Sequence, residues 1–114
     1  MPRVPLLKIA HGRSGDKGNL TNIGIIARHP DIYPFLIEQL TSSRVKEYMK
    51  HVCKGEVERY RMDNIEALNF VLHQSLDGGG TISLNADAQG KTYAMQLLRL
   101  ELEVPKELLA KAEN

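Results

Sequence analysis

HGRSGDKGNLTNIGIIAR, residues 11–28, joins a polar, glycine-punctuated run to a short apolar one. In residues 11–22 the glycines recur every three positions among charged and amide side chains, which predicts a loop. Residues 23–28 are rich in isoleucine and are followed by a His-Pro pair, which predicts a short buried strand. A second apolar run at residues 5–10 predicts a strand before the loop. We therefore expect two neighbouring strands on either side of a polar loop.

The rest of the chain contains segments with the hydrophobic period of a strand and segments with that of a helix. Residues 98–104 alternate apolar and polar side chains, which predicts a strand. Residues 56–62, EVERYRM, alternate in the same way except that Tyr60 breaks the phase, and they predict another strand. Residues 81–84 fit a short strand. Apolar residues at helical spacing predict helices over four segments: residues 31–40, 45–52, 65–76 and 87–97. Residues 106–114 are expected to form a helical tail that frays.

Strands and helices interleave here without a regular βαβ repeat. This pattern predicts a single α+β domain over residues 1–114, with its core at about 5–105. We expect one mainly antiparallel sheet that contains residues 5–10, 23–28, 56–62 and 98–104. Helices should pack on one face of it, in a ferredoxin-like sandwich.

Composition excludes several classes of function. The chain has 114 residues, a formal net charge of +1, 5% aromatic residues and no tryptophan, so neither nucleic acid nor a membrane is an expected partner. The single cysteine, Cys53, cannot form an internal disulfide, which favours a reducing compartment. The N-terminal apolar run is too short for a signal peptide. A cytoplasmic location is the resulting expectation.

The polar run at residues 11–22 has the chemistry of an anion site. Three glycines could adopt positive φ and converge their N–H groups on one point, while the two basic side chains add charge. The spacing matches neither the phosphate loop nor GxGxxG. The alternative is a structural loop whose charges are solvated. The candidate ligand-binding residues in this run are Arg13, Ser14, Gly15, Lys17, Gly18, Asn19 and Asn22; Gly12 is the first of the three glycines.

A second group of candidates lies at residues 69–80. Asn69 and His73 are one helical turn apart in the predicted helix, and His73 could act as a general acid or base. A merely solvated polar stripe is the alternative. Gly78, Gly79 and Gly80 follow and would let a ligand approach the backbone closely. The candidate catalytic residues of the chain are His11, His73 and Asp16, and the two groups are expected to surround one pocket.

No metal or cofactor is expected. His51 and Cys53 are two residues apart but lack a second pair of ligands. Cys53 also lacks an evident base or electropositive setting that would make it a nucleophile.

Five stretches resemble the C-terminal domain of the acyclic terpene utilisation (AtuA-like) proteins. They are HGRSGDKGNLTNIGIIAR, ARHPDIYPFLIEQLTSSRVKEYM, VERY, LNFVLHQSLDGGGTISLNADAQGK and LLRLELEVP, and they span about Leu7 to Pro105. Gly12 departs from the family, in which alanine is common there. The resemblance implies a ferredoxin-like fold. It also implies a domain that either follows a larger N-terminal domain or stands alone, in operons that degrade acyclic terpenes through acyl-CoA intermediates.

The resemblance suggests a small subunit that acts with a large AtuA-like chain in the catabolism of terpenoid or branched acyl-CoA. It would serve a lyase or hydratase step and is not expected to be active alone. His11 or His73 would carry the proton, Arg13 and Lys17 would clamp an acyl-CoA phosphate or another small anion, and Asp16 would hold those basic groups in place. Two alternatives stay open: a non-catalytic module that docks a partner, and a homodimer that senses a metabolite.

Overall fold

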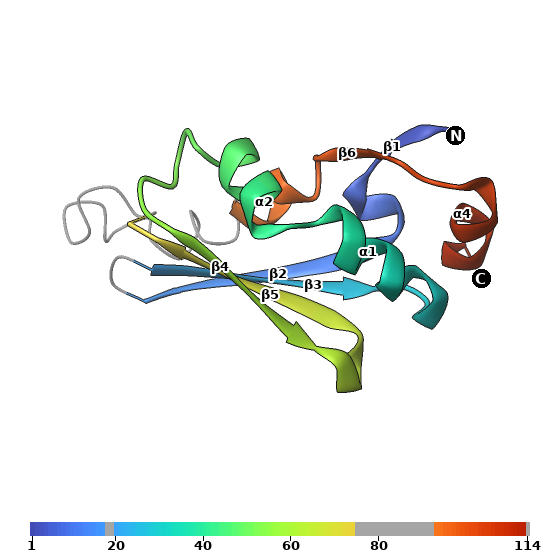
Figure 1. The fold of residues 1–114 in the computed structure, drawn as a ribbon, viewed down its shortest axis with the longest axis horizontal. Coiled ribbons are helices and arrows are strands. Elements are labelled where there is room, and N and C mark those ends of the chain that lie inside the picture. Colours follow the sequence, from blue (N-terminus) through green and yellow to red (C-terminus); the bar gives the residue numbers. More distant parts are fainter. Residues whose placement is uncertain (18–19, 75–92, 114) are drawn as a thin grey trace.

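The centre of the molecule is a four-stranded antiparallel sheet (Figure 1). The computed structural model describes residues 1–17, 20–74 and 93–113, with the backbone alone at residues 16 and 17. The strand order is β2-β3-β5-β4. The strands are β2 (Ala10–Lys17), β3 (Leu20–Ala27), β4 (Val57–Met62) and β5 (Ala67–His73). The expected α+β, ferredoxin-like architecture is confirmed.

Helices pack on one face of this sheet. Helix α1 (Tyr33–Gln39) and helix α2 (Ser42–Tyr48) lie over it in Figure 1. Residues 93–97 are also helical, and α4 (Lys106–Ala112) is the last helix. Three short 3-10 turns connect the elements: η1 (Leu6–Lys8), η2 (Pro30–Ile32) and η3 (Asp63–Ile65). Strand residues and helix residues share one buried core, which includes Ile23, Ile25, Leu68, Phe70, Leu72, Leu36, Leu40, Val45 and Met49.

The prediction that residues 5–10 and 98–104 join the main sheet is wrong. β1 (Arg3–Pro5) pairs antiparallel with β6 (Glu101–Glu103) in a separate two-stranded sheet. Residues 6–8 turn as η1, and the Leu6 and Leu7 amides donate to the carbonyls of Leu100 (2.8 Å) and Leu98 (3.0 Å). The apolar alternation of residues 98–104 correctly marked a half-buried segment, because Leu100, Leu102 and Val104 are buried. It could not indicate which strand would pair with it.

The predicted loop at residues 11–22 is wrong where the structure describes it. Residues 10–17 form β2, and β3 begins at Leu20. In this extended ladder neither Gly12 nor Gly15 has a positive φ, so their N–H groups do not converge as a nest requires. Gly12 instead packs closely under Leu98, whose Cδ1 lies 3.0 Å from the point a Cβ would occupy.

The predicted helix at residues 65–76 is wrong as well. The chain turns at Glu66, which has φ 53°, and then runs as β5 between β3 and β4. Leu68 and Leu72 are four residues apart and fit a helix, but Phe70 between them is also fully buried. That alternation at a period of two is the strand pattern. The predicted strand at residues 81–84 and the first part of the helix at 87–97 lie outside the described residues.

The helices predicted at residues 31–40 and 45–52 are observed, although the second spans Ser42–Tyr48 and so begins and ends earlier than predicted. Residues 31–40 contain η2 and α1, and the Thr41 hydroxyl caps α2 by accepting a hydrogen bond from the Arg44 amide (3.1 Å). The expected helical tail is α4. It is docked rather than free, since Leu108 and Leu109 pack against the core and Lys111 Nζ lies 2.6 Å from Asp31 Oδ2.

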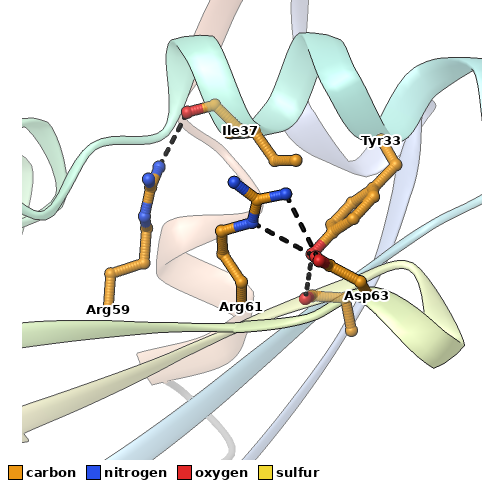
Figure 2. A network of polar contacts seen from close by, with 6 residues as sticks. Tyr33, Ile37, Arg59, Arg61 and Asp63 are labelled. Atoms are coloured by element: carbon orange, nitrogen blue, oxygen red, sulfur yellow. Dashed lines mark hydrogen bonds and ion pairs between the residues drawn. The ribbon is translucent and has the colours of Figure 1, made fainter.

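Polar contacts from the β4 edge fasten α1 to the sheet (Figure 2). Arg59 Nη1 donates to the carbonyls of Ile37 (2.7 Å) and Leu40 (2.8 Å), which satisfies the C-terminal end of the helix. The Tyr33 hydroxyl donates to Asp63 Oδ1 (2.6 Å), and the Arg61 guanidinium donates to both oxygens of the same carboxylate. Burial raises the pKa of Tyr33, and its hydroxyl lowers the pKa of Asp63. The basic residues of EVERYRM on this face are therefore structural.

Candidate functional site

The face of the sheet opposite α1 and α2 is the candidate site, and we call it the open face (Figure 1). Along β5, Leu68, Phe70 and Leu72 are buried under the helices, whereas Asn69, Val71 and His73 alternate with them and are only partly buried. No helix in residues 1–17, 20–74 or 93–113 covers this second face in Figure 1. The strands therefore present their polar side chains to solvent there.

The strand register aligns the open-face residues in rows across the sheet. One row is Arg13–Gly24–Asn69–Tyr60, and the next is Gly15–Asn22–Val71–Glu58. In a third row Lys17 lies opposite Leu20, and Leu20 opposite His73. Arg13, Gly15, Lys17 and Asn22 thus lie on one face of the sheet with Asn69 and His73, although more than 45 residues separate the two groups in the chain.

Two glycines, Gly15 and Gly24, leave the sheet surface without side chains at two points in these rows. A Cβ at Gly15 would meet nothing within 4 Å, and one at Gly24 would meet only Arg13 O and Asn69 Oδ1, both at 3.9 Å. The Asn69 amide therefore stands beside a strip of bare backbone, between the exposed Arg13 on β2 and the exposed Tyr60 on β4. A flat polar group could lie on this strip and contact the amide.

The His73 imidazole contacts the carboxylate of Glu58, which the sequence pattern does not indicate as a site residue. Its Nε2 lies 2.6 Å from Glu58 Oε1, and the Tyr60 hydroxyl donates to Glu58 Oε2 (3.1 Å). These contacts lower the pKa of Glu58, His73 contributing most, and Glu58 in turn raises the pKa of Tyr60. With Nε2 bound to the carboxylate, Nδ1 is the nitrogen left to exchange a proton. The alternation in EVERYRM places Glu58 and Tyr60 on one face, but only the strand register places that face beside His73.

A glycine fixes the backbone of His73. Gly55 N donates to His73 O (3.0 Å), and His73 N donates to Glu56 O (2.9 Å). A Cβ at Gly55 would fall 2.8 Å from His73 O, so no larger residue fits without displacement. A shallow depression here is lined by Lys54, Gly55, Glu56, Glu58, His73 and Gln74.

His11 lies at the far end of the open face. It occupies the row of Ile26 and Ala67, six residues along β5 from His73, which is about 20 Å at roughly 3.4 Å per residue. Its Nε2 is 3.3 Å from Arg28 Nη1. One small ligand cannot touch both histidines, so they are separate candidates.

Two other candidate residues lie on the opposite face of the sheet, and five lie outside the described residues. Ser14 and Asp16 occupy the rows of Ile23 and Thr21, which belong to the helix-covered face. The residues Gly18, Asn19, Gly78, Gly79 and Gly80 lie outside the described residues.

The comparison with protein families agrees with this fold. A family model described as the AtuA ferredoxin-like domain matches residues 4–103, which is most of the chain. The chain belongs to this family. No curated protein and no solved structure gives a significant match. The match to the AtuA ferredoxin-like domain runs from β1 through β6 and includes every open-face row.

The thiol of Cys53 has a structural place in the described part of this AtuA-like domain. Among the described residues, no three His, Cys, Asp or Glu side chains are grouped to hold a metal ion. Cys53 is buried, its thiol donates to His73 O (3.3 Å), and burial raises its pKa. This thiol packs in the core and supports the His73 backbone. Within the described ranges, no helix has the length and apolar character needed to cross a membrane.

Proposed function

We propose that this AtuA-like domain is a small subunit that acts with a larger AtuA-like chain on an acyl-CoA substrate, through its open face. The observation that carries the proposal is the pairing of His73 with Glu58 on the same uncovered surface as Arg13, Asn22 and Asn69. A carboxylate-bound imidazole is suited to proton transfer, as a hydratase or lyase step requires. The choice of pathway and partner follows from the resemblance to the acyclic terpene utilisation proteins.

The open face divides into two parts with different chemistry. Asn22 lies diagonal to His73 in the ladder, a neighbour distance of about 7–8 Å, so its amide could hold a carbonyl whose neighbouring carbon exchanges a proton with His73. Arg13 and the position of Lys17 lie on β2, at one edge of the sheet. An elongated substrate could place its acyl part near His73 and an anionic part along β2.

The experiment begins with a tagged chain purified from its native host. We expect a larger AtuA-like chain to co-purify, and the complex to hydrate or cleave an acyl-CoA. His73→Gln should abolish turnover while the complex still forms. Lys17→Ala should weaken acyl-CoA binding about 10–100-fold, the loss expected for a charge-assisted hydrogen bond. Lys8→Ala, an exposed lysine on η1, is the matched control and should bind normally. Full turnover by the His73→Gln complex would refute the catalytic proposal.

A docking module is the second candidate, because two large apolar side chains are exposed on β4. Tyr60 and Met62 are 49% and 42% exposed on the open face, and both residue types are enriched in protein interfaces. If the face only docks the larger chain, Tyr60→Ala with Met62→Ala should release that chain, and His73→Gln should not change turnover. Loss of turnover in an intact His73→Gln complex would rule out docking as the only role.

A further inference from the structure

A second depression lies in the helix layer, on the opposite side of the sheet from the open face. It is lined by Tyr48, His51, Met95, Gln96 and Arg99, and we call it the helix-layer pocket. Tyr48 ends α2 and His51 follows it, while the other three residues belong to the helical segment 93–97 and the turn after it. We propose that the helix-layer pocket binds a small oxyanion, a carboxylate or a phosphate monoester, that carries a short apolar tail.

The polar groups of the pocket supply hydrogen-bond donors. His51 Nε2 lies 2.8 Å from Gln96 Oε1, and because that oxygen can only accept, the imidazole nitrogen donates. This bond fixes the Gln96 side chain and leaves its NH2 group without a partner among the described residues. The Arg99 guanidinium likewise makes no hydrogen bond or ion pair within residues 1–17, 20–74 and 93–113. A guanidinium beside amide donors matches the fork of an oxyanion.

The charges around the pocket favour an anion. None of the five lining residues is acidic. On α2 and the turn after it, one acidic residue, Glu47, stands among four basic ones: Arg44, Lys46, Lys50 and Lys54. Glu47 is paired with Lys50 (2.9 Å) and Lys46 with Glu56 (3.3 Å), and Arg99 has no acidic partner among the described residues. Such a field attracts anions and repels cations.

The apolar lining of the pocket favours a ligand with an apolar tail. Met95 is 59% exposed, and a flexible thioether adapts to varied apolar partners. Met95 also borders a third depression, which Gly12, Arg13, Ser14, Ala94 and Leu98 line with it. A tail of a few carbons could leave Arg99 and pass over Met95 toward Leu98. A bare inorganic anion would leave this apolar surface uncovered.

The test is an NMR titration of the 15N-labelled chain with hexanoate, hexyl phosphate, acetate and hexylamine. We expect hexanoate or hexyl phosphate to produce saturable shifts at His51, Gln96 and Arg99, and the tighter of the two identifies the head group. Acetate should bind more weakly, because it lacks the tail, and hexylamine should not bind there. Arg99→Gln should weaken binding at least tenfold, as loss of a charge-assisted bond predicts. Arg44→Gln removes the same charge from α2 outside the pocket and should weaken binding much less than Arg99→Gln.

Three outcomes would overturn the proposal. One is the absence of saturable shifts with either hexyl ligand. Another is equal weakening by Arg99→Gln and Arg44→Gln, which would indicate general charge attraction. The third is saturable shifts confined to Asn22 and Asn69, which would place the ligand on the open face. The wild-type chain alone is sufficient for this titration, so failure of the acyl-CoA proposal would not affect its result.

Discussion

Replacing Gly55 by alanine should destabilise the fold and displace His73. The added Cβ would fall 2.8 Å from His73 O, 3.0 Å from His73 Cβ and 3.1 Å from His73 C. Two of these three atoms belong to the backbone, and the third is attached directly to it, so none can move away by a side-chain rotation. The φ of Gly55 lies outside the left-handed region, so the cost is steric and not conformational.

The loss of unfolding free energy can be estimated from the clash, because the backbone at His73 must move to relieve it. Overpacking by one methyl group against a fixed neighbour costs about 1–3 kcal/mol, which corresponds to roughly 4–12 °C in Tm for a chain of this size. Urea denaturation should show this loss of unfolding free energy, and NMR should show shifts at His73 and Glu58. Gly15→Ala is the matched control: nothing lies within 4 Å of its Cβ, so the same substitution should be neutral or stabilise by up to about 1 kcal/mol. A Gly55→Ala protein as stable as the wild type would refute the reasoning.

Three further predictions concern the contacts around the sheet. Arg59→Met should lower the free energy of unfolding in urea by about 1–3 kcal/mol, because two carbonyls at the end of α1 lose their donor. Arg61→Met should lower it by less than about 1 kcal/mol, because the ion pair of Arg61 is exposed. Equal losses in the two variants would contradict this. The pKa values of Glu58 and Asp63 are lowered, chiefly by His73 and Tyr33, so their contribution is present above about pH 4 and is lost as the pH falls through the lowered values. Unfolding measured between about pH 6 and pH 2 should therefore show falling stability, with a shallower slope in Asp63→Asn; an unchanged slope would argue against the contact. Cys53 should react with a thiol reagent only after unfolding, because it is buried and burial raises its pKa; rapid reaction in the native state would show otherwise.

The sequence predicts those elements whose pattern is local. Residues 31–40 and 56–62 form the helix and the strand that their spacing indicates. Leucines four residues apart suit both a helix and a strand, so the spacing in residues 65–76 predicts a helix where residues 67–73 form β5. The deciding contacts, ladders to β3 and to β4, come from distant parts of the chain. Propensity is a weak guide where tertiary pairing decides the conformation.

The candidate site shows the same division between local and distant information. The polar residues of 11–22 predict a loop, but residues 10–17 form a strand, because alternating polar residues also suit a strand with one solvated face. Sequence spacing could not separate Arg13 from Ser14, which belong to opposite faces. Nor could it join Glu58 to His73, 15 residues away. Both relations depend on strand register, which a single sequence does not specify.

The pairing of β1 with β6 has a consequence for the order of folding. Arg3 pairs with Glu103, so this ladder closes a loop of almost the whole chain, whereas β2–β3 and β4–β5 pair neighbours in the sequence. Loop closure costs more entropy as the loop grows, so neighbouring strands should meet first and the terminal ladder last. Three residue pairs offer few hydrogen bonds to hold it. Amide exchange should therefore be fastest in β1 and β6, and this end of the molecule should open while the four-stranded sheet stays intact.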